Sequence, residues 1–498
     1  MKLHYLFSFG IALLSIFGCK NNSESTVVEE KKQPNVLFIS VDDLNTMLGS
    51  YGGPAKTPNI DKLAAMGVQF NDAHCQAPLC GPSRASIMTG LRPSTSGIYG
   101  MIDDNKIVSD NPATKDIVLL PEYFKQNGYH TMGIGKLFHA HAPEGVFNES
   151  GGREKGFGPS PKVRFVWDGY GTSDRKNYGR TSTDWGAFPE SDALMPDHQS
   201  VNWAIKRLQK KHEKPFFMGV GFLRPHVPLY VPQKWFDLYS LDSIKTLPYL
   251  KEDLDDVPPI AHKINDLPMM PSTEWAIEHG EWKNIIQAYL ACISYVDYEI
   301  GRLLDALEDS EYADNTVIVF WSDHGYRLGE KSTFAKHALW NVATKVPLIF
   351  AGPNIPKGKV VNKPAELLSI YPTLLELCKL PSYSKNEGKS LVGTMKKENT
   401  LDKIVAITTY GYNNHGIKSS RYHYIQYEDG GEEFYDLLND PNEFHNLATL
   451  PAYNELLENF KKDLPKNNAK WDENSKYKFQ PYFVEQKARV NPSKNKSK

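Results

Sequence analysis

The stretch from Cys80 to Arg84 combines residue types that can do chemistry: it reads Cys-Gly-Pro-Ser-Arg. Pro82 holds the chain in a turn, and Ser83 is expected to cap a helix that begins just after it. A cysteine just before a helix lies at the positive end of the helix dipole, where an anion or a nucleophile is favoured. Arg84 follows about one helical turn later, where it can balance negative charge. Taken alone, Cys80 could equally be a small buried apolar residue, so the assignment depends on partners elsewhere in the chain.

Acidic residues follow two of the apolar runs that we expect to be central strands. One run ends at Asp42 and Asp43, and another ends at Asp323 and His324. The carboxyl ends of parallel strands meet at one edge of a sheet, which is where α/β proteins bind ligands. Adjacent carboxylates repel each other unless a cation neutralises them, although one capping and one solvated Asp would also fit Asp42 and Asp43. Calcium prefers oxygen ligands, so His324 leaves the identity of such a cation open.

Basic and imidazole side chains follow other expected strands. Lys136 comes directly after one of them, and a lysine there can hold an anion as a point charge. His139 follows three residues later, with His141 nearby as a competing candidate. His226 lies between two prolines, in Arg-Pro-His-Val-Pro, and is therefore expected on a rigid loop. A single histidine is more often structural than catalytic, so these assignments depend on the whole set.

The hydrophobic pattern alternates between buried strands and amphipathic helices, which is typical of an α/β fold. Its strands are expected at 35–41, 130–135, 216–222, 316–321 and 346–350, and its helices at 119–127, 200–211, 282–307 and 370–375. A polar stretch at 383–400 is followed by short alternating strands between 404 and 437. We see no internal repeat.

The composition is that of an ordinary globular protein: 498 residues, a net charge of -2 and 40% hydrophobic residues. A charge this close to zero gives no reason to expect nucleic acid as a partner. The five cysteines do not indicate a disulfide framework. Cys75 and Cys80 could pair in principle, but a bond between them would block chemistry at Cys80.

The N-terminus predicts export. An apolar run from Leu6 to Phe17 is too short to span a membrane and is followed by Gly18 and Cys19. Residues 1–18 therefore read as a signal peptide, and Cys19 after the cut resembles a bacterial lipobox. A plain signal peptide is the alternative. Residues 19–34 are polar and read as a flexible tether, so we expect a protein in the periplasm or at the cell surface, held by a lipid anchor on the outer membrane of a bacterium.

Together these motifs resemble the type I sulfatase family, and most closely its iduronate-2-sulfatase-like branch, which includes bacterial polysaccharide sulfatases. The resemblance covers roughly 35–460 and includes Cys-x-Pro-Ser-Arg at Cys80, Gly-Lys-x-x-His at Lys136, and the Asp-Pro-x-Glu turn that ends at Glu443. It implies an α/β alkaline-phosphatase-like sandwich, with a large mixed sheet between helices and a small C-terminal antiparallel sheet. The catalytic domain is then expected at 35–385, and the C-terminal subdomain, with a loose tail, at 386–498.

The resemblance also implies the site. Cys80 is oxidised to formylglycine by a maturation enzyme, and the hydrated aldehyde is the nucleophile. One divalent cation, expected to be Ca2+, is bound by Asp42, Asp43, residue 80, Asp323 and His324. The sulfate is bound by Lys136, His226 and Lys336, while Arg84 balances charge. His139 is the base that expels sulfate, and either His226 or Lys336 protonates the leaving oxygen.

The implied activity is hydrolysis of sulfate esters on a carbohydrate, such as oligosaccharides of ulvan, carrageenan, fucoidan or a glycosaminoglycan. A phosphate or phosphonate ester hydrolase remains an alternative, and so does a non-catalytic glycan-binding lipoprotein if Cys80 is unmodified. Tyr326 and Arg327 stand where the family has a tryptophan, and they are expected to select the sugar together with the irregular segment 145–200. That segment contains these aromatic and arginine residues: Arg153, Arg164, Trp167, Tyr170, Arg175, Tyr178, Arg180 and Trp185.

Overall fold

The computed structural model divides the chain into two units, Met1–Lys32 and Gln33–Lys498, and the second contains all the elements below. Apart from Met1, the structure describes residues 33–108, 111–154, 156–167, 169, 181–396, 405–478 and 480–492. The expected signal peptide core and Cys19 lie outside these residues. Among the described helices, none is both long enough and apolar enough to cross a membrane.

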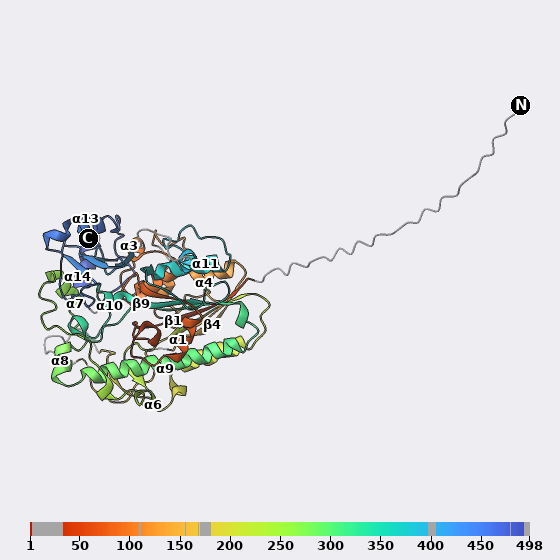
Figure 1. Cartoon of the computed structure of the whole chain (residues 1–498), viewed down its shortest axis with the longest axis horizontal. Helices are drawn as coiled ribbons and strands as arrows, with labels where there is room; N and C mark the ends of the chain where they lie inside the picture. Colours follow the sequence, from red (N-terminus) through yellow and green to blue (C-terminus); the bar gives the residue numbers. More distant parts are fainter. Residues whose placement is uncertain are drawn as a thin grey trace, which may run out of the picture. The chain divides into compact units, whose positions relative to one another are not determined.

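A large mixed sheet forms the centre of the second unit (Figure 1). Within the described residues it has nine strands, eight of them in the order β10-β2-β9-β8-β1-β6-β3-β4, with β11 paired to β2. Their bounds are β1 Asn35–Val41, β2 Gly67–His74, β3 His130–Gly135, β4 Glu149–Gly152, β6 Phe216–Phe222, β8 Thr316–Ser322, β9 Lys345–Ala351, β10 Lys359–Val361 and β11 Ala365–Glu366. Only β9 runs antiparallel to its neighbours, β2 and β8. Because β1 is parallel to both β6 and β8, the residues that follow these three strands meet at one edge.

Helices cover both faces of this sheet, because β1 is apolar on both sides. Leu37, Ile39 and Val41 pack into one core, and Val36 and Phe38 into the other, following the alternation of a strand. The first core is covered by α1 (Pro58–Ala65), α5 (Pro196–Leu208) and α9 (Trp282–Glu308), and the second by α2 (Cys80–Thr89), α4 (Leu120–Gln126) and α11 (Ile370–Leu377). Figure 1 shows α9 on one side of the sheet and α4 and α11 on the other. The predicted sandwich is confirmed.

A small antiparallel sheet follows, as predicted. Its strands are β12 (Ala406–Thr409), β13 (His415–Lys418), β14 (Tyr422–Gln426) and β15 (Glu432–Asp436), in that order. Helix α13 (Asn454–Lys461) packs on it through Leu457 and Phe460. The boundary expected at 385/386 stays a prediction.

The tail of the C-terminal subdomain, expected to be loose, is packed in its described part. Trp471 and Phe483 are 2% and 1% exposed, and α14 (Pro481–Val490) packs beside the small sheet. The stretch is rich in Lys and Asn, and this composition obscures the few aromatic side chains, such as Trp471 and Phe483, that anchor it. The other short elements are α3 Pro93–Ser96, β5 Trp185–Ala187, β7 Leu229–Val231, α6 Gln233–Phe236, α7 Pro259–Asn265, α8 Thr273–Glu278, α10 Asn341–Thr344 and α12 Val392–Lys396.

A buried ion pair connects the two sheets. Lys418 of β13 lies 3.1 Å from a carboxylate oxygen of Asp72 on β2, and His74 contacts the other oxygen at 3.0 Å. Burial alone would raise the pKa of Asp72, but its hydrogen bond with His74 and the charge of Lys418 outweigh burial and hold that pKa below the usual range. The carboxylate therefore depends on Lys418 for part of its stability.

We expect Lys418→Met to lower the free energy of unfolding at pH 7 by about 3 kcal/mol, because it leaves a buried carboxylate without its cation. A depressed pKa contributes stability above the ordinary Asp pKa of about 4, and that stability is lost as the pH falls below it. The difference between parent and variant should therefore be constant from pH 7 to 5 and shrink at pH 3 in urea titrations. Lys461→Met removes a more exposed pair with Glu432 and serves as the control. Equal stability of parent and Lys418→Met at pH 7 would contradict the prediction.

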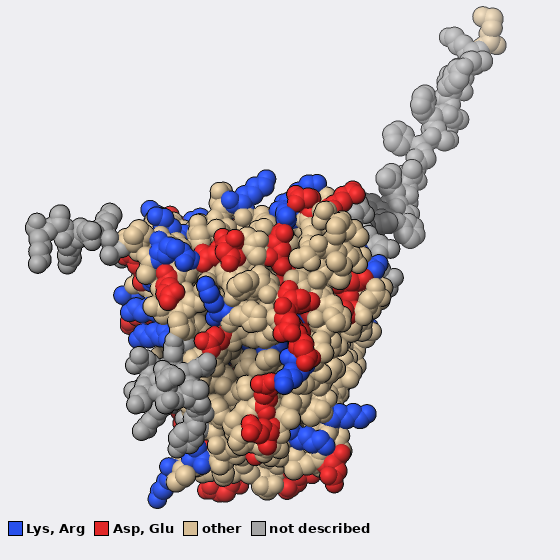
Figure 2. Space-filling model, turned by 90° about the vertical axis from the view of Figure 1, so that its left-hand side faces the viewer, with Lys and Arg blue, Asp and Glu red and all other residues tan. Residues whose placement is uncertain are grey.

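The surface charge is mixed on the face drawn in Figure 2. Acidic and basic side chains are interspersed there, and a run of Asp and Glu side chains descends along its right half. This distribution agrees with the near-neutral net charge of the chain.

Candidate active site

The residues expected to do chemistry converge at one edge of the large sheet. Asp42 and Asp43 follow β1, Asp323 and His324 follow β8, and Lys136 follows β3. The loop after β6 brings His226, and α2 begins with Cys80. Ion pairs, hydrogen bonds or a shared cavity connect every predicted site residue to the others. The parallel register of β1, β6 and β8 is what makes them meet.

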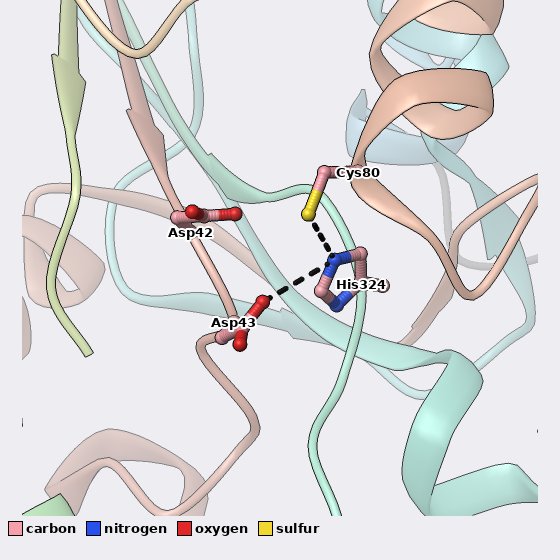
Figure 3. Close-up of side chains that lie close together, drawn as sticks. All are labelled: Asp42, Asp43, Cys80 and His324. Atoms are coloured by element: carbon pink, nitrogen blue, oxygen red, sulfur yellow. Dashed lines mark hydrogen bonds and ion pairs between the residues drawn. The ribbon is translucent and has the colours of Figure 1, made fainter. Parts of the chain in front are cut away.

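Four of these side chains point their ligand atoms at a common point (Figure 3). The atoms of Asp42, Asp43, Cys80 and His324 all lie within 4.8 Å of one another. His324 Nε2 is 3.2 Å from Cys80 Sγ and 3.4 Å from an oxygen of Asp43. Its Nδ1 donates to the carbonyl of Gly325 at 3.0 Å, which leaves Nε2 as the unprotonated nitrogen that faces the group. A backbone contact of this kind is how metal-binding histidines are usually oriented.

The carboxylates leave room for a cation. Asp42 Oδ1 and Asp43 Oδ2 are buried and accept no hydrogen bond. A buried carboxylate oxygen without a partner is costly, and a metal ion is the partner that fits this pair. Asp323 differs, because its oxygens accept from Arg84 Nε at 2.8 Å and from the backbone N–H groups of Asp43 and His324. Its role as a ligand stays a prediction.

Three carboxylates and three cationic side chains meet here, each no more than 5% exposed: Asp42, Asp43, Asp323, Arg84, Lys136 and Lys336. They pair as Asp42 with Lys136, Asp43 with Lys336 at 2.6 Å, and Asp323 with Arg84. The formal charges cancel. A bound divalent cation would give the site a net charge of +2, which favours an anionic ligand.

The pKa values reflect this balance. Burial raises the pKa of Asp43 and Asp323 above the usual carboxyl range. For Asp42, burial acts in the same direction, but the charges of Lys136 and Arg84 hold its pKa well below that range. For Lys336, burial is outweighed by Asp43, and its pKa lies well above the usual lysine value. Lys336 therefore holds its proton firmly.

Cys80 is a neutral thiol in this setting. Burial and the charge of Asp42 raise its pKa to about 12, and Lys336 Nζ lies 3.2 Å from its sulfur. Because the thiolate is the reactive form of cysteine, an unmodified Cys80 is a poor nucleophile at neutral pH. Cys75, its expected possible partner, is a free thiol, and so is Cys80.

The expectation that Ser83 caps a helix starting after it is wrong. Helix α2 begins at Cys80 itself, so Ser83 lies inside the first turn. Its hydroxyl donates to the carbonyl of Asp323 at 2.6 Å. Ser83 therefore ties the start of α2 to the end of β8 and fixes Cys80 against the acidic residues.

Both candidate histidines are neutral. Burial and the charge of Lys136 lower the pKa of His139 to about 3, and burial with the charge of Lys336 lowers that of His226 well below the usual value. His226 donates from Nδ1 to the carbonyl of Val227 at 2.6 Å, and its ring stacks on Phe157 with centroids 4.5 Å apart. Its Nε2 then faces Asp43, 3.9 Å from a carboxylate oxygen.

Asp104 is a residue of this site that sequence reasoning missed. Its carboxylate accepts hydrogen bonds from the backbone N–H groups of His139, Ala140 and His141, at 3.2, 2.6 and 3.1 Å. Arg153 donates to the carbonyl of His139 from the other side. Asp104 therefore holds the loop that carries His139, and nothing in the local sequence connects two segments 35 residues apart.

Comparison with known proteins identifies the family. The family model described as Sulfatase matches residues 34–380. The chain belongs to the sulfatase family. A second model, N-sulphoglucosamine sulphohydrolase, C-terminal, matches residues 329–470. The chain is accordingly a sulfuric ester hydrolase, as the sequence predicted.

Individual proteins that are similar to this sulfatase agree with the family assignment. A protein named Sulfatase from Formosa agariphila is 64% identical over 99% of this chain and 97% of its own length. The human iduronate 2-sulfatase is 33% identical, covering 72% of this chain and 73% of its own. A structure solved in complex with its substrate D-glucosamine-2-N,6-O-disulfate has a TM-score of 0.65 at 22% identity, covering 86% of this chain and 98% of that one. At this identity it supports the fold alone.

The sulfatase has a cavity of about 440 Å³ directly over Cys80. Besides Cys80 its polar walls include Lys136, His139, His226 and Lys336. A largely apolar side is contributed by Met101, Phe157, Val227, Met269 and Met270. The cavity thus combines basic side chains at its floor with apolar side walls that can pack against the ring of a bound ligand.

The segment 145–200 contributes to this cavity only in part. Arg153, Phe157 and the pair at 181–182 line it. Trp167 and Trp185 are buried instead, and Arg164 binds backbone carbonyls within the segment. The other expected residues, Tyr170, Arg175, Tyr178 and Arg180, lie outside the described part of the chain.

The expectation that Tyr326 and Arg327 contact the sugar is wrong. They are 1% and 0% exposed and lie beneath the loop that carries Lys336. Arg327 donates to the backbone carbonyls of Ala335 and Lys336, at 3.0 and 2.8 Å. These two residues therefore support the loop that carries Lys336 from below.

Proposed function

We propose that this sulfatase releases sulfate from a sulfated carbohydrate, using a formylglycine formed at Cys80. The observation that carries the proposal is the position of Cys80: its sulfur lies at the cavity floor, 3.2 Å from both Lys336 Nζ and His324 Nε2. With its pKa raised to about 12, the thiol itself is a poor nucleophile, and this supports oxidation as the activating step. When formed, formylglycine supplies a hydrated aldehyde whose hydroxyl is the nucleophile.

We propose that a divalent cation, Ca2+, is held by Asp42, Asp43, His324 and an oxygen of the modified residue 80, with Asp323 completing the set. The two unpartnered carboxylate oxygens support it, and replacing sulfur by oxygen at position 80 makes the donors suit a hard cation better. When bound, the cation supplies positive charge that polarises sulfate oxygens and favours ionisation of the nucleophile.

The side chains of this chain would then act as follows. Lys136 and Lys336 bind the sulfate oxygens, and Arg84 pairs with Asp323, which opposes the effect of burial on the pKa of Asp323, while adding positive charge. His139 is neutral and can accept a proton from a hydroxyl on residue 80. Two side chains are candidates for the proton that reaches the leaving sugar oxygen: Lys336 is protonated beside Cys80 but holds its proton firmly, while His226 is neutral with Nε2 as an acceptor.

We propose a carbohydrate substrate because the cavity combines its anion floor with apolar and aromatic walls. Human iduronate 2-sulfatase and the structure solved with a disulfated glucosamine are named for sugar substrates, which supports the same class here. Export, lipidation at Cys19 and modification by a maturation enzyme complete the proposal, and they are inferred from the sequence.

The test combines mass spectrometry and turnover. The Cys80 peptide from the native host is expected to be lighter than the unmodified peptide by about 18 Da, the difference between the cysteine thiol and the formylglycine aldehyde. The same protein is assayed for sulfate release from sulfated oligosaccharides of ulvan, carrageenan, fucoidan and glycosaminoglycans, with a phosphonate monoester as a competing substrate. An unmodified Cys80 with no turnover would reject the proposal in favour of a binding protein. Faster phosphonate hydrolysis would favour the phosphonate ester hydrolase.

We expect Asp104→Asn to lower kcat for sulfate release by about 10- to 100-fold with little change in KM, because misplacing His139 affects proton transfer more than binding. In the variant, one carboxylate oxygen is replaced by an NH2 group. The remaining oxygen can still accept, but the NH2 group is a donor and cannot accept from the backbone N–H groups of the His139 loop. The exposed Asp116→Asn is the control. An unchanged kcat and pH profile would show that Asp104 does not position His139.

A further inference from the structure

A second hollow adjoins the catalytic cavity. Its volume is about 380 Å³, and it shares Met101 and His139 as walls with the cavity over Cys80. Because the same two side chains line both spaces, the hollow lies directly beside the space over Cys80. The far wall is contributed by the C-terminal segment through Asn474, Lys476 and Lys478.

The backbone that carries these lysines is fixed in place. Lys476 and Met101 form an antiparallel bridge, with hydrogen bonds of 2.7 and 2.6 Å between their backbones. The buried Ser475 accepts from the backbone N–H of Gly100 at 2.8 Å. This pairing joins the C-terminal segment to the segment that follows α3, so the hollow is built by two parts of the chain far apart in sequence.

The hollow is electropositive. Lys106, Lys476 and Lys478 line it, against a single lining carboxylate, Asp103. Lys106 also contacts Asn474 at 3.3 Å. His139 adds no charge, since its pKa is lowered to about 3 by burial and Lys136. The formal charge of the lining is thus +2, next to a catalytic cavity in which Asp43 is the one lining carboxylate among the described residues, beside Lys136, Arg153 and Lys336.

We propose that this hollow binds a second anionic group, a sulfate or a carboxylate, on the same carbohydrate whose sulfate ester lies over Cys80. Lys476 and Lys478 supply the charge, and the anion they recognise belongs to a neighbouring position of the ligand. The inference rests on the proposed carbohydrate function. It makes the preferred ligand an oligosaccharide with at least two anionic groups, because a simple monosulfate reaches only the catalytic cavity.

The experiment is a calorimetric titration of the full chain carrying Cys80→Ala, which cannot turn over, with sucrose octasulfate as a carbohydrate that presents several sulfates. In this background Lys476→Gln/Lys478→Gln is expected to weaken binding by about fivefold to tenfold, the range for two partly exposed ion pairs. Lys210→Gln/Lys211→Gln removes the same charge at an exposed site after α5 and should change the affinity less than about twofold.

The inference is overturned if Lys476→Gln/Lys478→Gln leaves the affinity for sucrose octasulfate unchanged. It is also overturned if this double variant and Lys210→Gln/Lys211→Gln lower that affinity equally. Absence of octasulfate binding to the Cys80→Ala chain would also overturn it. Failure of the proposed function would instead appear in the mass spectrum and the turnover assay, as an unmodified Cys80 and no sulfate release. The titration needs neither the modification nor turnover, so the two failures can be told apart.

Discussion

Replacement of Cys80 by alanine is expected to reduce sulfate release by about 10⁴-fold or more, the scale of losing a covalent nucleophile. Cys80 lies at the cavity floor and begins α2, and its sulfur contacts Lys336 and His324. Formylglycine at position 80 is the proposed nucleophile, and alanine cannot form it. The measurement is the rate of sulfate release per mole of folded protein, with folding checked by the melting temperature.

Cys75→Ala is the matched control for this prediction. Cys75 is also a buried free thiol, five positions before Cys80, but it packs in the apolar core. Its replacement leaves a small cavity that should lower stability by about 1–2 kcal/mol while leaving the rate within about twofold. A Cys80→Ala protein with more than a hundredth of the parent rate would mean that catalysis does not proceed through residue 80.

The strands that position the site could be predicted from the sequence because they are buried on both faces. β1, β3 and β6 have the predicted bounds, since continuous runs such as Val36 to Val41 need no partner to be recognised. β2 was missed. It contains Gln69, Asn71 and Asp72 among its apolar residues, and these are accommodated by contacts from distant segments, including Lys418. Such a strand has no clear pattern of its own.

The site's members were predictable where a motif names them, but their supports were not. The sequence indicated Lys336, yet the contacts of Arg327 with its backbone carbonyl come from packing. Tyr326 and Arg327 were expected at the sugar because of their place after Gly325, and the chain turns them inward instead. Asp104 shows the same limit, since its three backbone contacts depend on a loop that no spacing rule describes.

The charges explain why the motifs occur together. Each carboxylate at the sheet edge has a cationic partner, so the site can stay buried without a ligand and still accept a cation and an anion together. A cation that binds the free oxygens of Asp42 and Asp43 competes with Lys136 and Lys336 for the same carboxylates. Both lysines would then be released toward the incoming sulfate.

Removal of the cation, by EDTA or by Asp42→Asn, is therefore expected to lower the rate of sulfate release by about 10³-fold, because it removes positive charge from the developing transition state. Re-addition of Ca2+ should restore the EDTA-treated parent but not the variant. Because burial raises the pKa of Asp43 and Asp323, protons compete with the cation, and its binding should be weaker at pH 5.5 than at pH 7.5.

A readout that needs no turnover is the melting temperature. Ca2+ at 100 times its dissociation constant contributes about 2.7 kcal/mol, and this should raise the melting temperature of the parent by several degrees while leaving Asp42→Asn unchanged. Asp297→Asn is the matched control: Asp297 is a buried carboxylate with a raised pKa that binds the backbone N–H groups of Asn59 and Ile60, at the start of α1. This variant should melt earlier but keep the whole increment from Ca2+. An Asp42→Asn protein that responds to Ca2+ as the parent does would place the cation elsewhere, because the unpartnered oxygen of Asp42 would then have no part in holding it.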